Sequence, residues 1–325
     1  MSTVADGDFH FFWYALTKPH AFAKEYFDAR MISVRIEHRG AIHPIPSVLA
    51  GANISMPVIK RIVRKLFSAF DFEITHKSRE RVSAENFRNL VSVYEHQLIE
   101  SGAGNIQTGN PLRPRLLGRL KGTPPSQAFE IIKMLSETAY IRGDVCEFGV
   151  AQGETSALIA NEIRGSDKTL HLFDSFKGLP APTEKDQLKD DVFSLGDMDA
   201  YQGKMSCPVD MVKSRLAMIG YPRAKYRIHQ GFIEDLINEK RGFPKSISFA
   251  YVDFDFYEPI KIALKFLGSK LSESGIIMVD DYDYFSTGAK TATDEFITYM
   301  NRDRQNYNLE VADKRLGHFA CIKKL

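Results

Sequence analysis

The stretch "GDVCEFGVAQGETS", residues 143–156, combines an apolar strand signal, an acidic residue and two glycines. Gly149 and Gly153 permit a tight turn and a close approach of the backbone to a ligand. Ser156 lies in the first turn of the helix predicted next, whose free N–H groups suit an anion such as a carboxylate. A dinucleotide fingerprint would need a further glycine where Ala151 stands, so the turn disfavours a pyrophosphate.

Glu147 lies ahead of the first glycine, where its negative charge would repel phosphate and attract an ammonium group. The ligand expected at this turn therefore carries both an ammonium and a carboxylate. The next predicted strand, "TLHLFDSF", ends at Asp174, which is placed to accept both hydrogen bonds of a ribose diol. An amino acid joined to a nucleoside describes S-adenosylmethionine, and we predict this methyl donor. The alternative is a structural turn with incidental acids.

Two further apolar strands, "FAYVDFDFYEP" and "GIIMVDDYDYF", end in acidic residues. Parallel strands end at the same edge of a sheet, so Asp253, Asp280 and Asp281 are expected to converge. Carboxylates this close repel one another unless a cation lies between them, and all-oxygen ligands suit Mg²⁺ or another hard divalent ion. The alternative is that these acids cap strand ends or are solvated. Weaker candidates for this site are Asp255, Asp283 and Glu258.

From residue 124 onward, amphipathic helices alternate with short apolar strands. This alternation is typical of an α/β fold, in which helices cover both faces of a parallel sheet. A predicted helix at 291–300 precedes two strand-like pieces, 307–313 and 317–325, which indicate an antiparallel hairpin at one edge of the sheet. The polar, irregular segment 181–208 is typical of a lid that becomes ordered when the acceptor binds.

The first part of the chain differs from the rest, being rich in His, Arg and aromatic residues. We predict a mostly helical extension at 1–120, with a role in substrate binding, oligomer formation or covering the site, and a catalytic domain at 121–325. In the extension, residues 57–70 form an amphipathic helix with a basic face. It either contacts a membrane surface or an anionic ligand, or packs on the core with its charges solvated. We expect a homo-oligomer.

The overall composition excludes several classes of protein. With 43 Lys and Arg against 41 Asp and Glu, the formal net charge of +2 gives no indication of a nucleic-acid partner. Three widely spaced cysteines form neither a disulfide framework nor a zinc site, which favours a reducing compartment. Because the sequence contains neither a signal peptide nor a transmembrane stretch, we predict a cytoplasmic protein.

These motifs, in this order, resemble the macrocin O-methyltransferase family of class I S-adenosylmethionine-dependent methyltransferases, which act on sugar hydroxyls of glycosylated natural products. The resemblance covers roughly residues 125 to 325, including "LFDSFKGLP" and "HQGFIEDL". In the family an aspartate precedes an Asp-Asp pair by 27 residues, and Asp253 precedes Asp280 by the same number. Phe232 stands where the family usually has Trp. The resemblance implies a Rossmann-like, mostly parallel seven-stranded sheet with an antiparallel C-terminal hairpin.

The resemblance also implies roles for individual residues. Asp253 would bind Mg²⁺ and would be the base, or the group that orients the base, for the sugar hydroxyl. Asp280 and Asp281 would complete the metal site. The residues that would hold S-adenosylmethionine are Glu147, Gly149, Gly153 and Ser156 for the methionine part, Asp174 and Ser175 for the ribose, and Gly231 and Phe232 beside the adenine.

Two other functions remain open from the sequence. The Asp-x-Asp in "VDFDF" resembles the metal site of a glycosyltransferase, which would bind a sugar nucleotide and leave the glycine turn without a role. The chain would otherwise be a catalytically silent, methyltransferase-like subunit whose extension binds a partner or a membrane. The sequence does not identify the acceptor.

Overall fold

The computed structural model describes residues 32–35 and 73–325, apart from 103, 240–241 and 303–305. The chain divides into two compact units, Met1–Asn89 and Leu90–Leu325. In the first unit, strand β1 (Ile32–Arg35) pairs antiparallel with β2 (Glu73–His76). Helix α4 (Lys77–Glu100) follows β2 and continues into the second unit. The helix predicted at 57–70 lies outside the described residues, and the division at residue 120 stays a prediction.

The second unit is built on one seven-stranded sheet with the order β5-β4-β3-β6-β7-β9-β8. Strands β3 to β7 run parallel, whereas β9 pairs antiparallel with both β7 and β8. The predicted parallel sheet with a C-terminal antiparallel hairpin is therefore confirmed. The strands are β3 (Asp144–Phe148), β4 (Leu170–Asp174), β5 (Tyr226–Gln230), β6 (Ile247–Val252), β7 (Leu271–Val279), β8 (Tyr307–Val311) and β9 (Ala320–Lys324).

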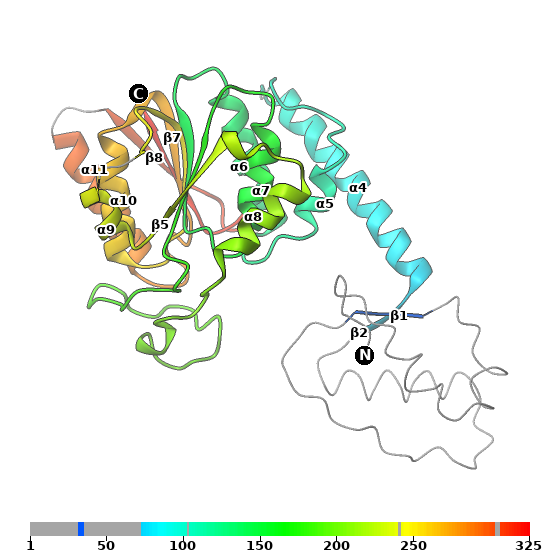
Figure 1. Cartoon of the computed structure of the whole chain (residues 1–325), viewed down its shortest axis with the longest axis horizontal. Coiled ribbons are helices and arrows are strands. Elements are labelled where there is room, and N and C mark those ends of the chain that lie inside the picture. Colours follow the sequence, from blue (N-terminus) through cyan, green and yellow to red (C-terminus); the bar gives the residue numbers. More distant parts are fainter. Residues whose placement is uncertain (1–31, 36–72, 103, 240–241, 303–305) are drawn as a thin grey trace, which may run out of the picture. The chain divides into compact units, whose positions relative to one another are not determined.

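Helices cover both faces of this sheet (Figure 1). All six residues of β6 are buried, as expected for a central strand with an apolar layer on each face. One layer contains α6 (Pro125–Glu137), α7 (Glu154–Glu162) and α8 (Val209–Met218), and α5 (Arg113–Leu117) contacts α7. The other contains α9 (Ile233–Glu239), α10 (Tyr257–Gly268) and α11 (Gly288–Arg302). None of the described helices is long and apolar enough to span a lipid bilayer.

Backbone hydrogen bonds join the loops that leave the sheet at the carboxyl ends of its parallel strands. The N–H of Asp253 donates to the carbonyl of Phe148 over 2.7 Å, and the N–H of Asp280 donates to that of Val252 over 2.8 Å. We call this side of the sheet the carboxyl edge. The glycine turn after β3 and the acids after β6 and β7 therefore lie next to one another, as the sequence predicted.

Gly149, directly after β3, is required where two of these loops touch. Its φ of +86° lies in the left-handed region, and a Cβ atom there would collide with the carbonyl group of Asp253. Because the neighbouring atoms belong to the backbone, no side-chain movement relieves the collision. The glycine therefore allows the turn after β3 to pack directly against the loop after β6.

We expect Gly149→Ala to lower the free energy of unfolding by about 3 kcal/mol or more, because it combines a strained φ with a backbone collision. Gly196→Ala is the matched control, since Gly196 has a φ of +79° but a Cβ atom added there would meet no other atom within 4 Å. That control should cost only about 1 kcal/mol. Urea unfolding of both variants makes the measurement, and equal losses would contradict the role given to Gly149.

Candidate active site

The turn after β3 presents an acid and a helix start to the carboxyl edge. Glu147, the fourth residue of β3, is 1 % exposed, and its carboxylate accepts a hydrogen bond from the Ser156 hydroxyl. Burial raises the pKa of Glu147 to about 8. Gly153, with a φ of +81°, directly precedes α7, and no side-chain hydrogen bond from this N-cap position satisfies the first N–H groups of that helix. An ammonium and a carboxylate therefore have complementary groups here.

Asp174, at the end of β4, is tied to the same turn. Its carboxylate accepts hydrogen bonds from the N–H groups of Val150 (2.7 Å) and Ala151 (2.9 Å), and from Phe176 N–H. Asp174, the residue predicted to bind the ribose, therefore also holds the glycine turn in place. Ser175 next to it is buried, and its hydroxyl accepts from Lys177 N–H over 3.0 Å.

The loop after β5 lies beside Asp174. The N–H of Gly231 donates to the Asp174 carbonyl over 2.9 Å, and Phe232 follows it, half-buried, before α9. The Lys177 ammonium lies 6.0 Å from the centre of the Phe232 ring. These contacts place Gly231 and Phe232 next to the residues predicted to bind the ribose.

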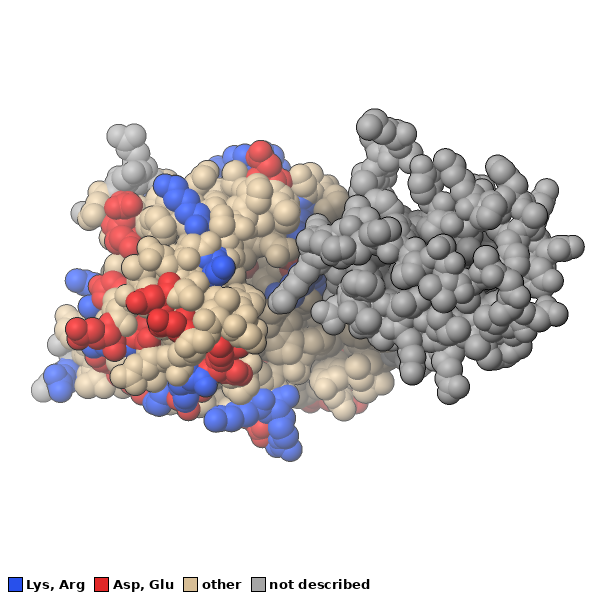
Figure 2. All heavy atoms as spheres, turned by 90° about the horizontal axis from the view of Figure 1, so that it is seen from below, with Lys and Arg blue, Asp and Glu red and all other residues tan. Residues whose placement is uncertain are grey.

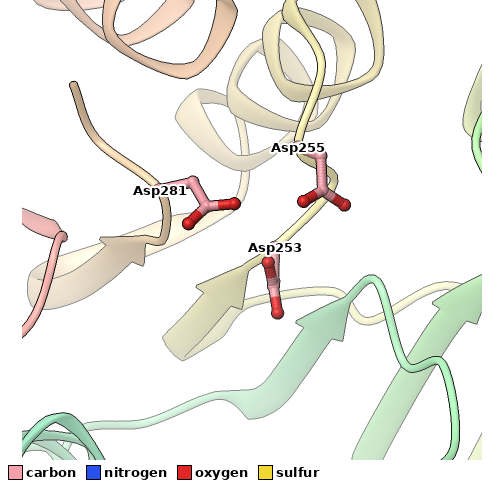
Figure 3. A group of neighbouring side chains, drawn as sticks. All are labelled: Asp253, Asp255 and Asp281. Carbon is pink, nitrogen blue, oxygen red and sulfur yellow. The ribbon is translucent and has the colours of Figure 1, made fainter. Parts of the chain in front are cut away.

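Three carboxylates converge at the ends of β6 and β7. Asp253, Asp255 and Asp281 each offer an oxygen, and these oxygens all lie within 4.8 Å of one another. Figure 3 shows their side chains gathered around a common space beyond the two strand ends. We call these three residues the acidic cluster. The donor set, three half-buried carboxylates, is one that suits a hard divalent cation.

The charge of the acidic cluster is poorly compensated. Burial and the nearby carboxylates raise the pKa of Asp253 and of Asp281 well above the usual range, and burial raises that of Asp255 to about 7. On the described part of the face in Figure 2, acidic and basic side chains are interspersed. Among the surface carboxylates, that of Asp283 pairs with the Lys189 ammonium. A cation at the cluster would relieve this repulsion.

Asp280, the third predicted metal ligand, has a different environment. It is buried, and its carboxylate accepts hydrogen bonds from the Gln127 amide (2.7 Å) and the Tyr251 hydroxyl. One of its oxygens also accepts from Asp281 N–H over 2.8 Å. The Asp280 carboxylate therefore holds the backbone of Asp281. The three carboxylates that come together are those of Asp255 and of the two other predicted residues, Asp253 and Asp281.

Sequence reasoning gave Asp255 too little weight and did not find Gln127 or Tyr251. β6 ends at Val252, so Asp255 lies in the loop that follows, where it has a φ of +61°. The left-handed backbone turns its carboxylate toward Asp281. The Asp-x-Asp spacing was the available signal for Asp255, whereas Gln127 is 153 residues from Asp280 and no local pattern links them.

Solved structures identify the class of protein. The O-methyltransferase NovP matches 72% of this chain and 98% of its own length, at 21% identity and a TM-score of 0.52. The calicheamicin methyltransferase CalS11 matches 71% of this chain and 91% of its own, at 18% identity and a TM-score of 0.50. These likenesses and the strand order establish a class I methyltransferase fold.

Sequence comparison then gives the family. The macrocin O-methyltransferase (TylF) family model matches residues 127–311, and the chain belongs to that family, as its motifs predicted. It is a methyltransferase, and the family implies S-adenosylmethionine as the methyl donor. A relative from Streptomyces olivaceus, 8-demethyl-8-(2,3-dimethoxy-alpha-L-rhamnosyl)-tetracenomycin-C 4'-O-methyltransferase, is 27% identical over 184 residues, 52% of this chain and 67% of the relative. The family decides against a glycosyltransferase.

The raised pKa values predict how the metal-free protein responds to pH. The pKa of Asp255, about 7 when folded, is above its unfolded value, so the folded state binds more protons and loses stability as pH rises toward and through 7. Asp255→Asn should therefore raise the melting temperature in EDTA by a few °C at pH 8, on the order of 2–4 °C per kcal/mol, and by less at pH 5.

The control is Asp283→Asn, which removes a carboxylate whose pKa the neighbouring Lys189 lowers. Its loss should not stabilise the protein at either pH. Thermal unfolding of both variants at pH 5 and pH 8 makes the comparison. If Asp255→Asn melted below the wild type at pH 8 in EDTA, the repulsion assigned to the acidic cluster would be wrong.

Proposed function

We propose that this protein transfers the methyl group of S-adenosylmethionine to a hydroxyl group on the sugar of a natural product, with a divalent cation at the acidic cluster. The observation that carries the proposal is the contact between the glycine turn after β3 and the loop that carries the acidic cluster. The turn with Glu147 and Gly153, suited to an amino-acid head, packs through Gly149 against the backbone of Asp253. A donor and a coordinated acceptor hydroxyl would therefore lie side by side.

The donor would be held by groups from three strand ends. Glu147 and the first turn of α7 would bind the ammonium and carboxylate of its methionine part, with Ser156 orienting the Glu147 carboxylate. Asp174 and Ser175 would contact the ribose, and Gly231 and Phe232 would flank the adenine. These assignments are supported by the adjacency of the residues and by the family motifs that they occupy.

Asp253 and Asp281 would bind the cation, with Asp255 as the third carboxylate, and Asp280 would hold the Asp281 backbone through its hydrogen bond to the Asp281 N–H. A bound Mg²⁺ lowers the pKa of a coordinated hydroxyl. Asp253 would take, or orient the group that takes, the proton of the sugar hydroxyl as the oxygen attacks the methyl carbon opposite the sulfur. Holding these atoms in line supplies several kcal/mol of the barrier reduction.

The acceptor class is supported by the family and by the relative from Streptomyces olivaceus, whose name describes methylation of a rhamnosyl group at its 4' oxygen. We propose a sugar hydroxyl of a glycosylated natural product for this chain as well. A homo-oligomer, a cytoplasmic location and a role of the N-terminal extension in covering or binding the acceptor remain part of this proposal.

Activity tests the proposal directly. The protein is incubated with S-adenosylmethionine, Mg²⁺ and a panel of rhamnosyl and other deoxysugar glycosides, and products are detected by mass spectrometry. We expect methylation of at least one glycoside, complete loss of activity in EDTA and recovery when Mg²⁺ is added back.

Asp253→Asn should reduce kcat by about 100-fold or more, within the range of general-base and positioning effects. Wild-type turnover of this variant with saturating Mg²⁺ would show the assignment to be wrong.

Cofactor affinity provides a second prediction. Because the pKa of Glu147 is about 8 in the free protein, the carboxylate that attracts the ammonium is mostly protonated at neutral pH. The affinity for S-adenosylhomocysteine should rise about tenfold between pH 6 and pH 7, since a tenfold larger fraction of Glu147 is ionised. Calorimetry should show this rise in the wild type and a weaker, pH-independent affinity in Glu147→Gln. If the affinity depended equally on pH in both proteins, Glu147 would be excluded as the group that binds the ammonium.

A further inference from the structure

Residues 179–204, which we call the insertion, pack on the two loops that carry the acidic cluster. Leu188 forms an antiparallel bridge with Ser286, and the N–H of Lys189 donates to the Phe285 carbonyl over 3.0 Å. A small apolar core joins the insertion to both loops, and Tyr201 at its centre is fully buried. This core contains Leu179, Met198 and Tyr201 from the insertion with Phe256 and Phe285 from the loops.

Asp186 is the buried charged residue of this contact, with an exposed fraction of 4 %. One of its carboxylate oxygens accepts a hydrogen bond from the N–H of Tyr257 over 2.7 Å. The other accepts from the N–H and the hydroxyl of Thr183, both over 2.8 Å. Both oxygens of Asp186 are therefore used, one within the insertion and one outside it.

The Tyr257 N–H belongs to the first residue of α10. The residue that precedes it, Phe256, offers no side-chain cap to the helix. The Asp186 carboxylate therefore caps the first N–H of α10 although Asp186 lies 71 residues earlier in the chain. A carboxylate at a helix N-terminus satisfies an unpaired N–H and interacts favourably with the helix dipole.

The start of α11 closes the same junction. A Cβ atom on Gly288 would collide with the capping oxygen of Asp186 and would lie 2.7 Å from the Tyr257 nitrogen. The Ser286 hydroxyl donates to the carbonyl of Asp255 over 3.1 Å and accepts from Gly288 N–H over 3.0 Å. The loop from Asp253 to Tyr257 is thus fixed at one end by β6 and at the other by the Asp186 carboxylate.

We propose that Asp186 is a positioning residue for the acidic cluster: by capping α10 it holds Asp253 and Asp255 in the arrangement that binds the cation. This inference rests on the metal site of the proposed function. Asp255 sits in a left-handed backbone conformation between the strand end and the capped helix, and such a conformation persists only where its surroundings enforce it. The insertion is therefore part of the metal-binding structure.

The test is Asp186→Asn, which keeps the size of the side chain and removes its charge and part of its acceptor capacity. Mn²⁺ binding is followed by electron paramagnetic resonance and S-adenosylhomocysteine binding by calorimetry. We expect the Mn²⁺ Kd to rise at least tenfold, as for other groups that orient metal ligands, and the cofactor Kd to change less than twofold. A merely structural loss would weaken both.

Asp197→Asn is the matched control, because Asp197 lies in the same insertion, is exposed and, among the described residues, accepts a hydrogen bond only from the N–H of Asp199. It should bind Mn²⁺ like the wild type.

Thr183→Val is a milder variant that removes one donor to Asp186. It should fold normally and should raise the Mn²⁺ Kd two- to threefold. Gly288→Ala should reproduce the effect of Asp186→Asn, and the double variant should be no worse than either.

The outcomes separate the two proposals. If the wild type binds no Mn²⁺, the metal site of the proposed function fails and this inference fails with it. If the wild type binds Mn²⁺ and both Asp186→Asn and Thr183→Val bind it equally well, only the positioning role is overturned. Equal weakening of Mn²⁺ and cofactor binding in these variants would also overturn it.

Discussion

Carboxyl groups shielded from water at the carboxyl edge are the constraint on which the rest of this structure depends. Glu147, Asp253, Asp255 and Asp281 all have raised pKa values, mainly because they are removed from water. Without positive ligands the folded protein binds protons at these groups instead. An ammonium group and a divalent cation can each replace such protons, so ligand binding, proton release and stability are linked at this edge.

Direct backbone contact connects the two halves of the site. Gly149 leaves room for the carbonyl of Asp253, while the N–H of Asp253 donates to the last residue of β3. Main-chain contacts therefore hold the donor loop against the backbone of Asp253, the first residue of the acidic cluster. In-line methyl transfer benefits from such rigidity because its barrier depends strongly on the positions of three atoms.

The fold was largely predictable because apolar strands and glycine turns are local patterns. β3, β4, β6 and β7 were all found from short apolar runs, and the parallel order of their ends brought Glu147 and Asp253 to one edge. The acids that follow the strands were found for the same reason. Their side-chain directions were less predictable, since Asp255 and Asp281 have positive φ values of 61° and 55° that neither residue type requires.

Contacts between distant segments were beyond reach of the sequence. Gln127 comes from the helix before β3 and donates to Asp280, and Asp186 caps a helix that begins 71 residues later. Both contacts satisfy buried polar groups. Which groups are buried, and which residues lie close enough to pair with them, is known only from the three-dimensional structure. The polar, irregular sequence around Asp186 predicts a lid that becomes ordered with the acceptor, and this stays a prediction. The buried contacts of the segment with the loops after β6 and β7 were not predictable from the sequence.

The most direct test of the central claim is to count the protons released when Mg²⁺ binds. Calorimetric titration of the cofactor-free protein with Mg²⁺ at pH 6.5, repeated in buffers with different ionisation enthalpies, gives that number. If the acidic cluster holds protons in place of a cation, about one proton or more should be released for each Mg²⁺ bound. Binding with no proton release, or no binding at all, would contradict this account of the site.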